Sequence, residues 1–352
     1  MHTDTEIKEI IEKVSSDLRA RYRIPQKALE LENFKDQVRS LFNQRYHDSL
    51  SYLDKYRIRR EIKLVHSIRR KLHRTNYIMR VTDKSGVFHV GSLTDYERKA
   101  REYQLKTNAY VELSSNPLME TYDKVVRLLN NLRSKNQIAA WQYSKMMPNK
   151  NKIKLAYLYF IPKPHKVIVF MFTVHVVINI FYILQQGTPL RPIISGKNAP
   201  TTRISKMLDT LIRPLFDEYA RQTTIIDGIF LLRRLQKYVS LGLLKPTTLL
   251  CTFDITDLYT MLPQEEAIDF LKKFLVQFGH HHVKGMTIDA IENLARTVLT
   301  ENVFIYNNKY YRQVKGGAMG SPFTLTLANI FMWHWEQKLV QQQIISNELY
   351  GR

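Results

Sequence analysis

Two aspartates, Asp254 and Asp257, stand close together in the stretch FDITDLY at residues 253–259. The apolar run TLLCTF that includes Cys251 predicts a β-strand, with the cysteine as a small core residue. A carboxylate at the end of a buried strand needs a cation or hydrogen-bond donors, and Mg²⁺ prefers oxygen ligands of this kind. A turn or a helix cap is the other interpretation of a lone aspartate at this place.

Two more stretches carry residues suited to binding anions or nucleic acid. LRPIIS at 190–195 contains Arg191, whose planar guanidinium binds phosphate or carboxylate through paired hydrogen bonds. GGAMGSP at 316–322 combines glycines, which let a backbone approach closely, with Ser321 and Pro322, which predict the start of a helix. The alternatives are an ordinary surface arginine and a helix start without further function.

The order LRPIIS, FDITDLYTMLP, GGAMGSP, with PKPHK before them, resembles the reverse transcriptases of Penelope-like retroelements over residues 76 to 340. The resemblance implies an α+β right-hand polymerase fold with fingers, a helical N-terminal region and an incomplete antiparallel palm sheet. It also implies an RNA-directed DNA polymerase that adds deoxynucleotides to a DNA primer on an RNA template. Two Mg²⁺ ions serve this nucleotidyl transfer in the family.

The resemblance assigns a role to each matching residue of the catalytic and nucleotide sites. Asp254 would be the catalytic, metal-binding aspartate, and the carbonyl of Ile255 would share a metal. Asp257 would hold the incoming triphosphate through its backbone N–H, and the ring of Tyr259 would exclude a ribose 2′-hydroxyl. Arg191 would bind the triphosphate.

Four further residues receive roles in the same way. Lys84, in TDKSG, would assist Arg191 in binding the triphosphate. The turn of Gly320, Ser321 and Pro322 would lie under the templating base of the template–primer.

The family's next motif, Tyr-x-Asp-Asp, does not occur, and the 352 residues contain no adjacent pair of aspartates. Asp254 alone cannot hold two Mg²⁺ ions. We therefore expect that this chain is truncated before that motif, lacks the downstream thumb and endonuclease regions, and does not polymerise. A basic, non-catalytic nucleic-acid-binding remnant is the alternative function.

An apolar block at 167–186 interrupts the match, because its removal leaves the family-like text IPKPHKGTPLRPIIS. Its 20 residues correspond to 60 bases in frame, valine codons begin with GT, and CAG encodes glutamine. We hypothesise a retained intron, with a genuine insertion as the alternative. Residues 167–184 are also long enough to cross a bilayer, but the span would separate its ends by about 30 Å. The resemblance places those ends close together in the fingers loop, so a single-pass membrane protein is only the third interpretation. We expect no membrane partner.

Composition limits the classes further. Lys and Arg number 53 against 32 acids, a net charge of +21, which suits nucleic acid or an acidic membrane surface. One cysteine excludes an internal disulfide framework, and the first 25 residues show no apolar core of the kind that a secretory signal needs, so a nuclear or cytoplasmic location is expected. The helix predicted at 55–74 carries nine basic residues against one acid. A solvated face and a phosphate-binding face both remain open for it.

We predict three regions: a basic helical region at 1–75, a fingers-like region at 76–246 and a partial palm at 247–352. Within them, YIMRV and VFHV predict strands joined by a turn at DKSG. The segment MLPQEEAIDFLKKFLVQFG predicts a helix that ends at Gly279, and Asn307-Asn308 predicts a hairpin turn.

Overall fold

The computed structural model describes residues 7, 10–16, 25, 28–47, 51–83, 86–163 and 188–352. Lys84 and the apolar block 167–186, both singled out from the sequence, lie outside the described residues. The chain divides into two compact units, residues 1–75 and 76–352.

Among the described residues of the first unit, residues 10–16, α2 (Leu29–His47) and α3 (Tyr52–Arg74) are helical. Helix α3 begins at a serine cap, where the amide nitrogen of Asp54 donates to Oγ of Ser51 at 3.1 Å. None of the side chains of α3 is buried.

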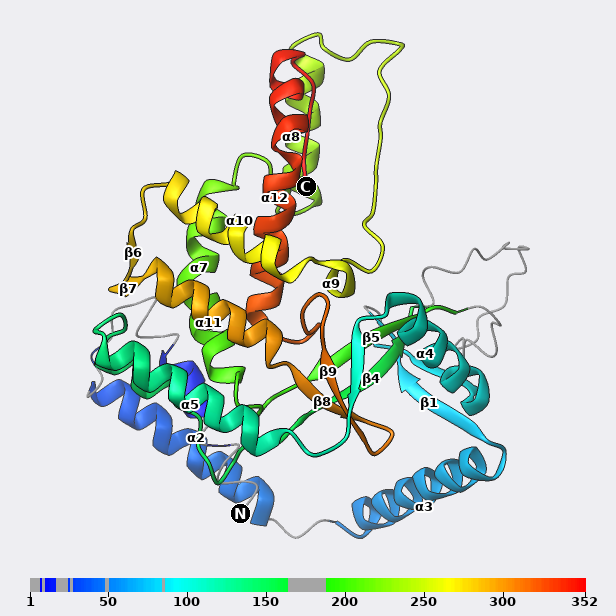
Figure 1. Cartoon of the computed structure of the whole chain (residues 1–352). Coiled ribbons are helices and arrows are strands. Elements are labelled where there is room, and N and C mark those ends of the chain that lie inside the picture. The colour runs from blue at the N-terminus through cyan, green and yellow to red at the C-terminus, as the bar shows by residue number, and fades with distance from the viewer. Residues whose placement is uncertain are drawn as a thin grey trace. The chain divides into compact units, whose positions relative to one another are not determined.

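The second unit combines helices with three small sheets, so the predicted α+β class is confirmed (Figure 1). Its elements are β1 (Tyr77–Val81), β2 (Phe88–Ser92), α4 (Leu93–Thr107), β3 (Tyr110–Leu113), α5 (Leu118–Ser134), α6 (Ala140–Met146), β4 (Ala156–Pro162), β5 (Leu190–Ser195), α7 (Thr202–Tyr219), α8 (Gly228–Ser240), α9 (Leu258–Met261), α10 (Gln264–Gln277), β6 (His282–Val283), β7 (Met286–Thr287), α11 (Ile288–Thr300), β8 (Val303–Tyr306), β9 (Lys309–Gln313) and α12 (Pro322–Ile345).

The largest sheet has the order β3-β9-β8-β4-β5, and its strands are antiparallel except for the parallel pair β4 and β8. The predicted hairpin is confirmed: Asn307 and Asn308, between β8 and β9, both have positive φ angles. Strand β5 forms one edge of the sheet, a place that tolerates Pro192 because an edge strand leaves donors unpaired.

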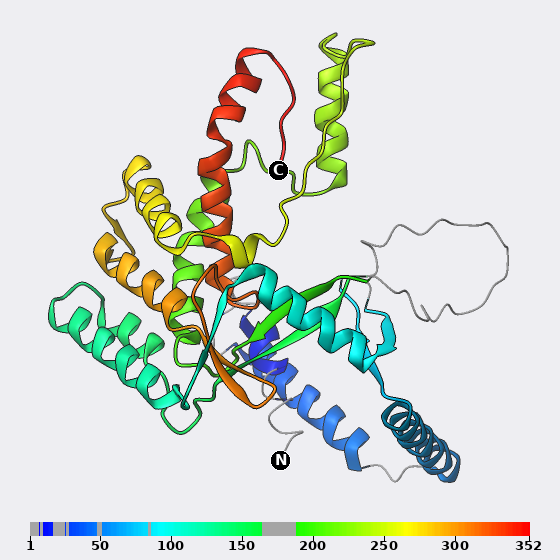
Figure 2. The ribbon, with the colours of Figure 1, turned by 45° about the vertical axis from the view of Figure 1, so that its right-hand side comes forward.

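The main core lies among α5, α6, α7, α10, α11 and α12, where Phe274, Leu294, Phe323 and Leu327 are almost fully buried. Burying each such side chain contributes about 2 to 3 kcal/mol. Helices α7, α10, α11 and α12 gather beside the sheet in both views (Figures 1 and 2). A smaller core joins α4 to the sheet through Ala100 and Phe160.

The strand predicted at TLLCTF does not form, and residues 248–255 are neither helix nor strand. A strand needs a hydrogen-bonded neighbour, and no described strand of the three sheets pairs with this segment. Its apolar side chains are consequently exposed, Leu249 at 83% and Leu250 at 87%. The prediction of a core cysteine is wrong for the same reason, since Cys251 is exposed.

Candidate functional site

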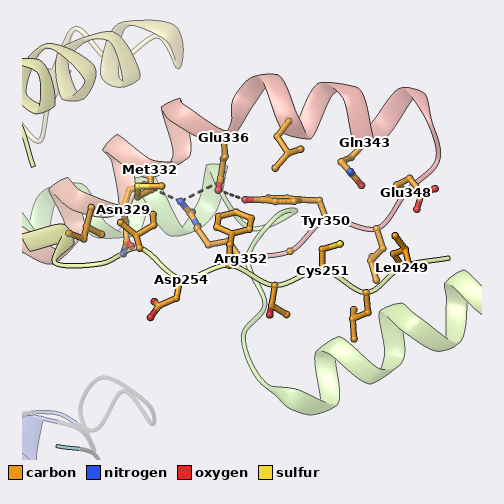
Figure 3. Close-up of a pocket in the computed structure, with 18 of the residues that line it drawn as sticks. Leu249, Cys251, Asp254, Asn329, Met332, Glu336, Gln343, Glu348, Tyr350 and Arg352 are labelled. Carbon is orange, nitrogen blue, oxygen red and sulfur yellow. Dashed lines mark hydrogen bonds and ion pairs between the residues drawn. The ribbon is translucent and has the colours of Figure 1, made fainter. Parts of the chain in front are cut away.

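A cavity of about 1180 Å³ collects residues from the segments that the sequence singled out. Its wall includes Arg191 from β5, Asp254 and Ile255 from the extended segment, and Asp257 and Tyr259 where α9 begins. The opposite wall comes from α12 and the last residues of the chain (Figure 3). Five predicted site residues therefore line one cavity, although they come from distant parts of the sequence.

The glycine turn joins this site through backbone contacts. The amide nitrogen of Gly316 donates to the carbonyl of Leu262 at 2.9 Å, and that of Gly317 donates to Tyr259 at 2.8 Å. A Cβ at Gly316 would stand 2.0 Å from the Tyr259 oxygen, so only glycine fits.

The other end of the same turn lies against β5. The amide nitrogen of Ile194 donates to the carbonyl of Met319 at 3.1 Å, on the edge of β5 that pairs with no strand. Gly320 has a φ of +132°, and a Cβ there would stand 2.6 Å from the Ile194 oxygen. The turn thus connects LRPIIS with FDITDLY.

Ser321 and Pro322 lie where the sequence places them, at the start of a helix, since α12 begins at Pro322. Oγ of Ser321 lies 2.7 Å from Oγ of Ser205 in α7, and the amide nitrogen of Phe323 donates to that same Ser205 oxygen at 3.2 Å. Ser205 therefore supplies the capping acceptor from another helix, a role that the local sequence around Ser321 could not indicate.

Arg191 is held in an ion pair rather than left open to solvent. Its Nη1 lies 2.8 and 3.0 Å from the carboxylate oxygens of Asp83, which follows β1. Both side chains are mostly buried, and Nε of Arg191 has no hydrogen-bond partner among the described residues. A phosphate that binds Arg191 would have to compete with this carboxylate.

Asp254 and Ile255 lie on the exposed extended segment, not at the end of a buried strand as the sequence predicts. The physical reason is the missing strand: the segment before Asp254 does not join any of the described sheets, so no sheet covers the residue. The side chain of Asp254 points away from α12 (Figure 3).

Asp257 is positioned by α4. Its carboxylate accepts a hydrogen bond of 3.0 Å from Nζ of Lys106, and its φ of +55° places the backbone in the left-handed region. One turn away, the hydroxyls of Tyr103 and Thr260 lie 2.9 Å apart. Burial raises the pKa of Tyr103 to about 12. These contacts accompany a left-handed turn at Asp257, a conformation that aspartate tolerates better than most non-glycine residues.

Tyr259 is half-buried on the wall of the cavity, where both Arg191 and the glycine turn are neighbours. Burial raises the pKa of its phenol, while the positive charge of Arg191 acts in the opposite direction. Its hydroxyl is therefore neutral at physiological pH, and its ring contributes an apolar surface next to a cation.

Glu336 of α12 is a cavity residue that sequence reasoning missed. It is 1% exposed, and it accepts a hydrogen bond of 2.6 Å from Tyr350 while Nη1 of Arg352 lies 3.4 Å away (Figure 3). Burial raises the pKa of this carboxyl, and both partners counteract the shift. The available signal was a single acid within the apolar stretch FMWHWEQKLV.

The described residues do not complete a two-metal site. Mg²⁺ needs about six oxygen ligands in near-octahedral geometry, whereas the predicted donors are the carboxylate of Asp254 and the carbonyl of Ile255. Of the other acids on the cavity wall, Asp257 is paired with Lys106, Glu336 is buried beside Arg352, and Glu348 accepts a hydrogen bond of 2.9 Å from the hydroxyl of Tyr238. Within the described part of the chain, no group of three His, Cys, Asp or Glu side chains is placed to bind a metal.

The flanks of the apolar block meet in the sheet. Strands β4 and β5 pair from Tyr157–Ser195 to Pro162–Leu190, and the amide nitrogen of Lys163 donates to Pro189 at 2.9 Å. Among the helices of the described residues, none is sufficiently long and apolar to span a bilayer.

Comparison with known proteins adds no family assignment. No protein-family model matches the sequence, and no curated protein is significantly similar to it. The resemblance to reverse transcriptases therefore rests on the sequence motifs alone.

Proposed function

We propose that this chain comprises the fingers and part of the palm of a reverse transcriptase of the Penelope-like branch. In this proposal the cavity receives a deoxynucleotide, and the glycine turn contacts an RNA template paired with a DNA primer. The described carboxylates are too few for metal-assisted nucleotidyl transfer, so the proposed activity of this chain is binding without polymerisation. A nuclear or cytoplasmic location accompanies this function.

The observation that supports the proposal is the contact between the three motifs. The turn at 316–321 hydrogen-bonds to the start of α9 on one side and to β5 on the other. Motifs that match the family by chance would have no reason to meet through their own backbones around one cavity. Their convergence favours a shared nucleotide and template site.

The test measures whether nucleotide binding obeys a template. The full chain is titrated with each of two deoxynucleotides in the presence of Mg²⁺ and an RNA–DNA hybrid whose next template base is known. Tighter binding of the matching deoxynucleotide is expected, and Arg191→Gln should weaken it because the triphosphate loses a bidentate donor. Primer extension should yield no product from the wild-type chain or from Asp254→Asn.

The second candidate is a nucleic-acid-binding remnant with no nucleotide site, which the incomplete metal ligand set favours. Hybrid binding with no preference for the matching nucleotide would select this candidate. In both candidates hybrid affinity falls steeply with salt, because phosphate contacts release counterions. A single membrane span at 167–184, a segment outside the described residues, is the third candidate, and partition of the chain into detergent micelles through that segment would support it.

A further inference from the structure

We propose that helix α3 is a binding surface for the phosphate backbone of a nucleic-acid double helix. This inference rests on the nucleic-acid partner of the proposed function and adds a second contact site outside the cavity. Arg59, Lys63, Arg70 and Arg74 are all exposed. Their spacing of four, seven and four residues puts them on one face of the helix, along about 22 Å of its axis.

Among the described residues the cations of this face have no carboxylate partner, unlike Arg98 in α4 and Arg296 in α11. In α4, Arg98 lies between Asp95 and Glu102, and in α11 Arg296 contacts Glu292 at 3.2 Å. The ion pair found along α3 is Arg57 with Asp54, at 3.8 Å, and it lies outside the four-residue face. Within the described residues the face is thus uncompensated positive charge, which requires counterions or a polyanion.

An extended polyanion fits the length and density of this charge. A double helix carries about one phosphate charge per 1.7 Å of its axis, or roughly 13 charges over the length of the face. Several basic side chains can therefore contact phosphates at once, and each contact releases a counterion. A small anion would engage one or two of these side chains and leave the others uncompensated.

An anionic membrane is the competing occupant, because the other side of α3 exposes Ile58, Ile62 and Val65. Glu61 belongs to that same apolar side, three residues after Ile58 and four before Val65. Insertion of this side into acyl chains would bury the Glu61 carboxylate, which is costly without a partner. Binding through the basic face leaves Glu61 in water, so nucleic acid is favoured.

The test uses the full chain and a labelled 20-base-pair RNA–DNA hybrid, with anisotropy measured over a series of KCl concentrations. The variant changes Arg59, Lys63, Arg70 and Arg74 to Gln together. Its matched control changes three exposed arginines and one exposed lysine of the second unit to Gln, namely Arg101, Lys150, Arg221 and Arg233. Glutamine has nearly the helix propensity of Lys and Arg, and circular dichroism checks that α3 persists.

The α3 variant should lose at least about tenfold in affinity near 0.1 M salt. Its slope of log affinity against log salt should become shallower by about 3 to 4, since each phosphate contact contributes about 0.9. The control should keep the wild-type slope. Equal losses in both variants, or no hybrid binding by the wild-type chain, would overturn the inference.

A membrane readout separates the two occupants. Vesicles containing phosphatidylserine are titrated with the same three proteins. Vesicle binding that depends on the four residues, together with unchanged hybrid binding, would assign α3 to membranes and overturn the inference. The nucleotide test gives an independent result. If the chain shows no preference for the matching deoxynucleotide but the α3 variant still loses hybrid affinity, the proposed function is overturned and hybrid binding through α3 stands.

Discussion

The amide nitrogen of Gly317 donates a 2.8 Å hydrogen bond to the carbonyl oxygen of Tyr259, across 58 residues of sequence. This bond and its neighbours attach the glycine turn to the first residues of α9. The two segments lie so close together that a Cβ added at Gly316, the residue before Gly317, would stand 2.0 Å from the same carbonyl oxygen. The first prediction tests this contact.

Replacing Gly316 with Ala should destabilise the fold by about 3 kcal/mol or more, from backbone strain and from overlap with Tyr259. Gly242 is the matched control, since its φ of +70° is almost equal to the +69° of Gly316 but no atom would lie within 4 Å of an added Cβ. Gly242→Ala should therefore cost only about 1 to 2 kcal/mol. Urea unfolding of both variants measures the difference, and equal losses would contradict the close packing.

Asp83 competes with any anion for Arg191, because the two side chains form an ion pair at 2.8 Å. Asp83→Asn should raise the affinity for a deoxynucleoside triphosphate several-fold, since the guanidinium no longer has a carboxylate partner. Calorimetric titration measures the change. The double variant Asp83→Asn, Arg191→Gln should abolish the gain. If the gain persists, the triphosphate binds elsewhere.

Tyr103 should make unfolding stability depend on alkaline pH. Its folded-state pKa is about 12 against an ordinary 10, because burial disfavours the phenolate. The stability associated with the neutral phenol is fully present below pH 10 and is lost as the pH rises towards 12. Tyr103→Phe should lose about 1 kcal/mol at neutral pH, with its hydrogen bond to Thr260, and should show less alkaline loss. Tyr52→Phe, at a residue that is 83% exposed, should show neither change.

Glu336 should make stability depend on acidic pH in the opposite sense to an ordinary salt-bridged carboxylate. Burial raises its pKa in the folded state, so that state binds a proton more readily than the unfolded chain does. Its contribution is fully present below the unfolded pKa and is lost as the pH rises through the folded pKa. As the pH falls from neutrality towards 4.5, the ordinary pKa of a glutamate, the wild type should therefore gain stability relative to Glu336→Gln. Unfolding at several pH values measures this, and a difference independent of pH would refute it.

Deleting residues 167–186 should leave the fold intact, because β4 and β5 pair up to Pro162 and Leu190 and the amide nitrogen of Lys163 donates to Pro189, within a few residues of the block on either side. The connection shortens from about 25 to about 5 residues, which lowers the loop-closure cost by about 1.4 kcal/mol. Denaturation of the deletion variant should thus be cooperative with an equal or higher midpoint. A lost transition would show that the block belongs to the fold, against the retained-intron hypothesis.

Local features of this fold follow from the sequence. The hairpin at Asn307-Asn308, the helix end at Gly279 and the helix start at Pro322 all form as predicted. Each depends on the backbone preferences of one or two residues, which act over a few positions. The general α+β class is predictable for the same reason, because helix and strand periodicities are local patterns.

Contacts between distant segments required the tertiary structure. Strand β3 was not predicted, since Tyr110–Leu113 becomes a strand by pairing with β9 about 200 residues later. Conversely, the apolar run before Asp254 has the composition of a strand but pairs with no strand of the described residues, and it forms neither helix nor strand. Strand composition is therefore insufficient, because sheet hydrogen bonds come from another segment.

The candidate site likewise has features that the sequence determines and features that depend on tertiary contacts. The sequence alone determined which residues have suitable chemistry, namely a carboxylate at Asp254, a fork donor at Arg191 and glycines at 316–320. Only the tertiary structure decided that Asp83 forms an ion pair with Arg191, that Lys106 donates a hydrogen bond to Asp257, and that Glu336 is buried beside Arg352. A residue type defines what a side chain can bind, whereas its partner depends on which distant segments the packed core brings within a few ångströms.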